Sequence, residues 1–480
     1  MSRLSGSSIS ALRPQEIVER TLAAATHLAG CVVLVRENSE AVLRWANSTM
    51  TTNGHTTSGQ VTVIAMVAVE GGTAAGTVSS SVTVTDASQL ATLVAAAEAA
   101  ARDAGPADDA SPLPSSSDWA DARSAGASPG DPTWDLPAEE TSIGVYGRLA
   151  ADLAEVLAGP QRQYGFASHE LTTVWLGTSA GVRRRWVQPT GSVELNAKTP
   201  DLSGSAWAGV STSDFTDVDV IALAAEAARR LEWGKRRVTL PAGKYETLLP
   251  PSATADLMIY LAWSMEGRAA QEGRSALAGA DGTRVGERLT DLPLTLACDP
   301  AAPGLEYEPF LITTRSHEGL SVFDNGAPTR RVDWVREGVV SELAYSRAEA
   351  AEFGTTFTPG GDNLLLTGGS AASTADMVAS TERGLLLTCL WYIRLVDPTT
   401  LLLTGLTRDG VYLVEGGEVV GEVDHNFRFN HSPLDVLRRA TEVGATERTL
   451  PREWKDWFTR AAMPPVRVPE FTMSSVSLGR

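Results

Sequence analysis

Cysteine, histidine and long apolar runs are all scarce in this 480-residue chain. It has 3 cysteines, Cys31, Cys298 and Cys389, at wide spacing and without a CxxC pair, which argues against a disulfide framework or a cysteine-rich zinc site. No stretch reaches the ~18 consecutive apolar residues of a membrane helix. The first residues also lack the apolar core of a signal peptide. We therefore expect a cytoplasmic protein with no membrane partner.

Basic residues are also in deficit. The chain has 40 Lys and Arg against 58 Asp and Glu, a formal net charge of −18. Such an acidic surface disfavours binding to nucleic acid or to anionic membranes. A hydrophobic content of 43% is enough for real cores, and the length allows two or three domains.

Several common catalytic motifs are missing as well. There is no GxxxxGK[ST], no GxGxxG after a strand and no GxSxG, so nucleotide binding and a hydrolase elbow have no support. The His-Glu pairs at His169 and His317 have no second histidine four positions on, so neither is a zincin motif. Residues alone therefore leave the function open.

The first half of the chain shows one order of elements twice. The first pass predicts a helix over 14–29, a strand pair over 31–47 turning at Asn38-Ser39, more strands to about 85, and an alanine-rich helix capped by Asp86. The second pass predicts a helix from 139, a strand pair turning at 179–181, further strands, and a helix over 214–233. We expect two related helix–antiparallel sheet–helix modules, with the Pro- and Ser-rich residues 105–136 as an exposed linker or long loop.

The pattern changes near residue 240, and we predict domains over 1–240 and 241–480. Residues 256–277 predict an amphipathic helix that runs into a glycine-marked turn. Further on, antiparallel strands dominate, with a clear hairpin around Glu415-Gly416-Gly417-Glu418. The fold class we expect is α+β, with the modules followed by a mainly antiparallel β domain that has a few helices.

Three ordered blocks in the second half resemble the TldD/PmbA family, whose active members are zinc peptidases. They are DNGAPTRRVDWVREGVVSELAYSRAEAAEFG (324–354), GLLLTCLWYI (384–393) and TGLTRDGVYLVEGGEVVGEVDHNFRFNHSPLDVLRRATEVG (404–444). The resemblance covers about 250–480, and it continues more weakly, as a shared order of elements, over 14–235. Catalytic members carry HExxxH on a helix, followed by a run that Met265-Glu266-Gly267 resembles.

Counting back from that run places the family's motif on residues 258–263. Met258 and Trp263 then stand where the two histidines would be, and Ile259 stands where the glutamate would be. Zinc needs nitrogen, oxygen or sulfur ligands, and its bound water needs a base. Tryptophan cannot be a ligand, a thioether is a poor one, and isoleucine cannot accept a proton. The family's C-terminal cysteine ligand also has no counterpart in residues 445–480.

The resemblance therefore implies the non-catalytic partner type of the family, called TldE or PmbA. It implies no cofactor in this chain, and zinc in an HExxxH-bearing TldD-like subunit that forms a heterodimer or larger complex with it. The complex would process unfolded or small peptides, and this chain would be inactive alone. Residues we expect to line a peptide groove are Glu266, Arg268, Arg408, Asp409, Asn426 and Arg428.

Two other functions remain open. The chain could be a stand-alone peptide-binding homodimer, which the absence of an HExxxH relative from the same genome would favour. It could also be a hydrolase that uses Cys389 with His425 or His431. Cys389 lies in an apolar run, where a thiol is usually buried and inert.

Overall fold

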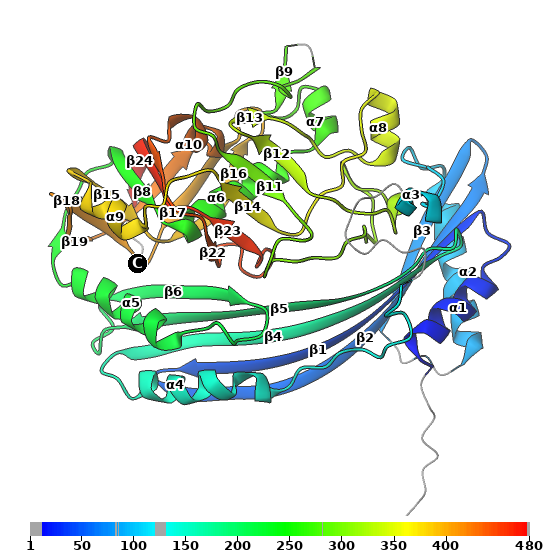
Figure 1. Ribbon diagram of the computed structural model, residues 1–480, viewed down its shortest axis with the longest axis horizontal. Coiled ribbons are helices and arrows are strands. Elements are labelled where there is room, and N and C mark those ends of the chain that lie inside the picture. The colour runs from blue at the N-terminus through cyan, green and yellow to red at the C-terminus, as the bar shows by residue number, and fades with distance from the viewer. Residues whose placement is uncertain (1–11, 82–83, 85, 121–130, 281, 478–480) are drawn as a thin grey trace, which may run out of the picture.

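The computed structural model describes residues 12–81, 84, 86–120, 131–280 and 282–477 (Figure 1). In that part of the chain, no helix is long and apolar enough to span a membrane. The fold is mixed α and β with mainly antiparallel sheets, and its second half is rich in strands, as the sequence predicted.

Both predicted modules are present, and they share one sheet. The first contains α1 (Pro14–Ala24), β1 (Gly30–Ala46), β2 (Thr49–Val69), β3 (Gly72–Ser80) and α2 (Ala87–Ala104). The second contains α4 (Gly147–Leu157), β4 (Arg162–Thr178), β5 (Arg183–Lys198), β6 (Ser205–Thr212) and α5 (Val220–Trp233). Because β1 pairs with β4, the six-stranded sheet has the order β3-β2-β1-β4-β5-β6. The two modules are thus arranged about the β1–β4 pair.

The predicted turn at Asn38-Ser39 is wrong, because β1 is a single strand of 17 residues. The polar middle of the strand is held by side-chain bonds: the Ser39 hydroxyl accepts a hydrogen bond from the Thr141 amide at 3.0 Å and lies 2.9 Å from His55 Nε2. The turn comes later, at Asn47 and Ser48, which have positive φ angles of 50° and 58°.

The predicted exposed linker is only partly correct. Residues 121–130 lie outside the described part of the chain, but α3 (Ser116–Ala120) packs onto the protein. Trp119 is 4% exposed, and its indole N–H donates to the carbonyl oxygen of Gly326 at 2.9 Å. Further along, Trp134 O accepts a hydrogen bond from the Gln15 side chain at 2.8 Å. The described parts of this segment therefore join distant parts of the chain.

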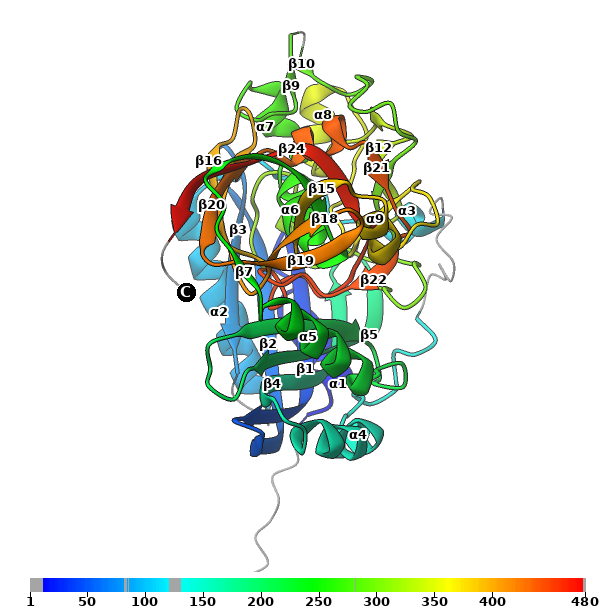
Figure 2. The same cartoon turned by 90° about the vertical axis from the view of Figure 1, so that its left-hand side faces the viewer.

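Two sheets and several helices form the second half (Figure 2). The larger sheet orders its strands as β16 (Leu390–Asp397), β17 (Leu402–Thr407), β20 (Asn426–His431), β24 (Val466–Ser477), β8 (Gly243–Leu249), β15 (Arg383–Leu387), β18 (Val411–Glu415), β19 (Glu418–Val423) and β7 (Arg237–Val238), with β21 (Glu442–Val443) beside β24. The smaller sheet orders β13 (Val339–Val340), β12 (Val332–Arg336), β11 (Thr295–Cys298), β14 (Leu364–Thr367), β23 (Ala461–Met463) and β22 (Glu447–Thr449), and β9 (Ala278–Gly279) pairs with β10 (Gly282–Thr283).

The helices of this half are α6 (Pro251–Trp263), α7 (Gly267–Gln271), α8 (Arg347–Phe353), α9 (Thr374–Ala379) and α10 (Pro433–Arg439). The predicted hairpin is confirmed as β18 and β19, and Gly416 and Gly417 take the positive φ angles of 60° and 84° that its turn requires. The apolar run 384–393 contains most of β15 and the start of β16, which lie at separate positions in the larger sheet.

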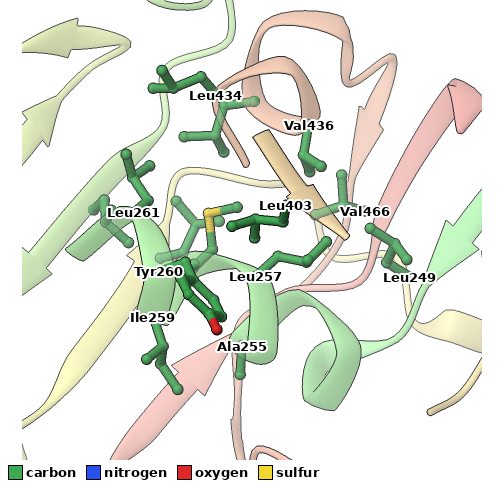
Figure 3. Close-up of a cluster of buried hydrophobic side chains, with 14 of the residues drawn as sticks. Leu249, Ala255, Leu257, Ile259, Tyr260, Leu261, Leu403, Leu434, Val436 and Val466 are labelled. Atoms are coloured by element: carbon green, nitrogen blue, oxygen red, sulfur yellow. The ribbon is translucent and has the colours of Figure 1, made fainter. Parts of the chain in front are cut away.

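The predicted helix over 256–277 is wrong in length and in character. α6 ends at Trp263, and a separate short helix, α7, follows. From Ala253 to Leu261 every residue of α6 is buried, so the helix has no polar face and is surrounded by core (Figure 3). A helix that is apolar all round is a buried core helix rather than an amphipathic surface helix.

Candidate functional site

The middle of α6 holds Met258 and Ile259, which are predicted from the sequence to stand at the first two positions of the family's motif. Met258 and Ile259 are both 0% exposed. They belong to the large core cluster of the second half, where neighbours on α6, β17, α10 and β24 surround the helix (Figure 3). Both side chains are therefore ordinary core residues.

Trp263, the third position, lies at the C-terminal end of α6 and is 43% exposed. Its ring packs edge-to-face on Trp454 with centroids 4.8 Å apart, and on Tyr260 at 5.5 Å. Tyr260 and Trp454 also contact each other at 5.4 Å, and the Tyr260 hydroxyl donates to the Ile393 carbonyl at 2.8 Å. Trp263 thus belongs to an aromatic cluster at the C-terminal end of α6.

Asp256, the one acidic residue of α6, was not predicted as a site residue. It is 0% exposed, and its Oδ1 accepts a hydrogen bond from the Glu453 amide at 2.9 Å. Its Oδ2 is buried without a hydrogen-bond partner. Burial raises the pKa of this carboxyl well above its usual value, so the protonated form is favoured. The sequence signal was a lone aspartate in an otherwise apolar helix.

These residues do not fit a zinc ion. Across the described residues, no group of three or more His, Cys, Asp or Glu side chains is placed to hold a metal. Near these positions α6 offers the buried Met258 thioether, the Asp256 carboxyl, whose protonated form is favoured, and the Tyr260 hydroxyl, which is bonded to the Ile393 carbonyl. These groups do not make a good zinc ligand set.

Glu266 and Arg268, predicted to line a groove, lie at the start of α7. Arg268 forms ion pairs with Glu349 at 3.1 Å, with Glu272 at 3.3 Å and with Glu352. Burial, together with the nearby Glu318, raises the pKa of Glu266. Arg268 therefore joins α7 to α8, and its donors already have partners within the chain.

Three other predicted groove residues lie around one cavity of about 270 Å³, between the six-stranded sheet and the larger second-half sheet. Arg408, Asp409 and Asn426 line it, together with His425 and Lys198. Arg428, the sixth predicted residue, is exposed on β20 and is not among the lining residues. The structure thus brings together three of the six.

An Asp–His pair forms one wall of this cavity. Asp424 Oδ1 lies 2.7 Å from His425 Nδ1, and its Oδ2 accepts from the Thr239 hydroxyl at 2.6 Å. These hydrogen bonds, that from Thr239 first, lower the pKa of Asp424. The cavity therefore offers carboxylates, cationic groups and an amide side chain, which are suited to binding polar groups of a ligand.

The arrangement needed for a cysteine hydrolase is not found among the described residues. Cys389 is 1% exposed and packs with Trp207 and Leu450. Burial raises the pKa of its thiol to about 12, so it is not a thiolate at neutral pH. Its sulfur has no contact with His425, and His431 is stacked on Phe471 at 4.6 Å instead.

Sequence reasoning also missed the most voluminous of the described cavities, about 1000 Å³. Its apolar walls include Trp186, Pro300, Pro328 and Phe357, and Arg331 lies among its polar lining residues. The walls come from segments far apart in the sequence, so no local pattern pointed to the cavity.

Comparisons with known proteins agree with this architecture. The model of the PmbA/TldA metallopeptidase central domain matches residues 131–235, and that of the PmbA/TldA metallopeptidase C-terminal domain matches residues 242–475. No curated protein matches the sequence.

Solved structures share the fold over nearly the whole chain. TldE from Thermococcus kodakarensis aligns with a TM-score of 0.75 at 15% identity, covering 95% of this chain and 99% of that one. A candidate modulator of DNA gyrase from Bacteroides thetaiotaomicron aligns at 0.74 and 15%, covering 96% and 98%. Another from Thermotoga maritima aligns at 0.73 and 17%, covering 95% and 99%.

Proposed function

This chain belongs to the PmbA/TldD metallopeptidase family, and from that premise we propose that it is a zinc-free, TldE-like subunit of a two-component peptidase. Its partner would be an HExxxH-bearing subunit of the same family, which would hold the zinc. The pair would process small or unfolded peptides in the cytoplasm.

One observation carries this proposal: every position of the metal motif holds a group that cannot do the chemistry. Met258 and Ile259 are enclosed in core, and Trp263 packs in an aromatic cluster. A site that had merely lost its metal would leave buried imidazole and carboxylate groups without partners, which is costly. Apolar packing of these positions supports a subunit that keeps the scaffold and leaves catalysis to a partner.

The cavity lined by Arg408, Asp409 and Asn426 supports a role in holding peptide. Its mixture of cationic, anionic and amide groups suits the termini and backbone amides of an extended peptide. We propose that peptide contacts this cavity on its way to the partner's zinc.

The test is co-expression of this chain with an HExxxH-bearing relative from the same genome. We expect the two chains to purify together, with zinc in proportion to the partner and peptidase activity only in the complex. The chain alone should contain no stoichiometric zinc and cleave no peptide. One tightly bound zinc per chain that is lost on substitution of Met258 would overturn the proposal.

A stand-alone peptide-binding homodimer is the second candidate. It predicts peptide binding by the purified chain without any partner, and no HExxxH relative in the genome. Substitution of Arg408 and Asn426 by alanine should then weaken binding of the isolated chain, as measured by calorimetry with an unfolded peptide.

A further inference from the structure

Strand β2 runs well past the end of its neighbour β3. β3 pairs with β2 only over Val61–Val69, whereas β1 pairs with it from Thr49 onward. Residues 49–60 therefore form a free edge of the six-stranded sheet (Figure 1). Twelve residues of strand extend about 40 Å. Within the described chain, no segment other than β1 hydrogen-bonds to the backbone of this edge.

The sequence of this edge, TMTTNGHTTSGQ, contains no charged residue and no proline. All of its residues except Gly54 are exposed. Proteins normally protect an open edge with charges, prolines, bulges or a short strand. Threonine is also a strong strand former. The register of β2 on β1 shifts once, at Thr51, and is regular over residues 52–60. This regular, uncharged part of the edge is suited to pairing with another strand.

In the second module, the first half of β5 is the equivalent of this edge, and it is covered by other residues of the chain. β6 pairs with β5 only over Gly191–Lys198, which leaves residues 183–190 unpaired by β6. In that stretch the Arg185 amide donates to Asp131 Oδ2 at 2.7 Å, and Pro189 has no N–H to offer. The Arg184 guanidinium lies 3.7 Å from the centre of the Trp119 ring. Residues of the same chain thus cover this part of β5 in the second module. In the first module, no described residue covers the corresponding part of β2.

The outer edge of β16 is protected in a third way. Its pairing with β17 is broken by two irregularities, and Tyr392 has a positive φ of 55°. The Ile393 amide donates to Glu453 Oε1 at 3.2 Å, and the Ile393 carbonyl accepts from Tyr260. Unlike these two examples, the edge of β2 is regular over residues 52–60 and has no cover among the described residues, which indicates a surface that another chain covers.

We propose that residues 49–60 pair, antiparallel, with the same residues of a second copy of this chain. In an antiparallel ladder, outward N–H and C=O groups occur on every second residue. Two identical edges can therefore pair about a two-fold axis that passes beside a residue, here Gly54 or His55. Such pairing places threonine, serine and amide side chains opposite one another with no like charges, although each chain carries −18. The two six-stranded sheets would become one continuous sheet.

The pairing does not depend on the proposed peptidase partner, and the purified chain tests it. Light scattering after gel filtration should give twice the chain mass. Hydrogen exchange should show slow amides in 49–60 that become fast when the protein is diluted to the monomer. The variant Thr52→Lys/Thr57→Lys adds edge charges at exposed positions and should give the single-chain mass. The matched control Thr355→Lys/Thr356→Lys, also at exposed threonines, should remain dimeric.

Three results would overturn the inference. One is a monomer at all concentrations, whether its edge amides exchange freely or are already protected within the single chain. Another is a dimer that survives the double lysine substitution while circular dichroism shows that the variant is folded. The third is protection of residues 49–60 only after an unlike subunit is added.

Discussion

Ile259 and Met258 lie where a polar side chain would find no partner. Ile259→Glu places a carboxyl in a site that is 0% exposed, and we expect a loss of about 3–5 kcal/mol in the free energy of unfolding, as for an unpaired buried charge. Urea denaturation measures it. Trp263→His, at a site that is 43% exposed, should cost much less. Equal stability of Ile259→Glu and the parent would show that the helix is not packed as described.

His431 gives the protein a pH-dependent stability. Burial lowers the pKa of this imidazole from its ordinary 6.5 to about 4, with Asp435, Arg439 and Lys244 as the charged neighbours. Above pH 6.5 the ring is neutral in both folded and unfolded chains. As the pH falls from about 6.5 to about 4, the unfolded chain takes up the proton first, so stability should drop by about 3 kcal/mol.

Replacing that ring isolates the effect. His431→Phe keeps a ring against Phe471 and should remove this part of the loss between pH 6.5 and 4. His317→Gln, at an exposed histidine, should leave the loss in place. The measurement is urea denaturation at a series of pH values. An unchanged profile in His431→Phe would rule out this assignment.

Helix α6 makes several contacts with the segment that follows β22. The Asp256 carboxyl accepts from the Glu453 amide, and Trp454 packs on Tyr260 and Trp263. The Ser252 hydroxyl donates to the Leu450 carbonyl at 2.7 Å. Through these contacts, α6 anchors this aromatic segment.

Asp256 variants test that anchor. Because burial raises its pKa, the acid is favoured in the folded state, and its contribution to stability declines as the pH rises from 3.8 through the folded pKa. Asp256→Asn keeps the acceptor oxygen and should remove this decline. Asp256→Leu removes the acceptor and should cost about 1–3 kcal/mol. Hydrogen exchange should then be faster at Glu453 and Trp454. Equal protection in both variants would contradict the anchoring role.

Elements whose pattern is local could be predicted from the sequence. The hairpin β18–β19 has paired glycines at its turn, and α2 begins at Asp86, whose side chain accepts from the amides of Ser88 and Gln89. The prediction failed in β1 because the partners of its polar middle, Thr141 and His55, lie elsewhere in the chain. It failed in α6 because an apolar helix does not show in its own residues how completely its surroundings enclose it.

The order of strands in the six-stranded sheet is a property of the whole molecule that local patterns do not contain. The repeated order of elements predicted two modules, but only the pairing of β1 with β4 joins them. The candidate site follows the same rule. The positions predicted for the motif lie in one short segment, so a local pattern could point to them, whereas the cavity around Arg408 combines residues from β5, β7 and the turn before β18.

The two halves of the molecule share a buried cluster, which we call the seam cluster: Val32, Leu34, Leu176, Phe310 and Phe323. Phe310 and Phe323 are 0% and 1% exposed, and they cover the face of the six-stranded sheet that the helices α1 and α2 do not. The stability of the sheet should therefore depend on residues of the second half.

Phe323→Ala tests this dependence. Loss of a buried ring costs about 3–5 kcal/mol in the free energy of unfolding. Because the ring packs on the six-stranded sheet, hydrogen exchange should become faster in β1 around Val32 and Leu34. These residues lie about 290 positions away from Phe323 in the sequence. Phe471→Ala, at an equally buried ring inside the second half, is the control. It should speed exchange in β24 and β20 and leave β1 protected, because the ring packs on Phe429 and His431 of β20 and its core cluster contains no residue of β1. Unchanged exchange in β1 on Phe323→Ala would mean that the halves open independently.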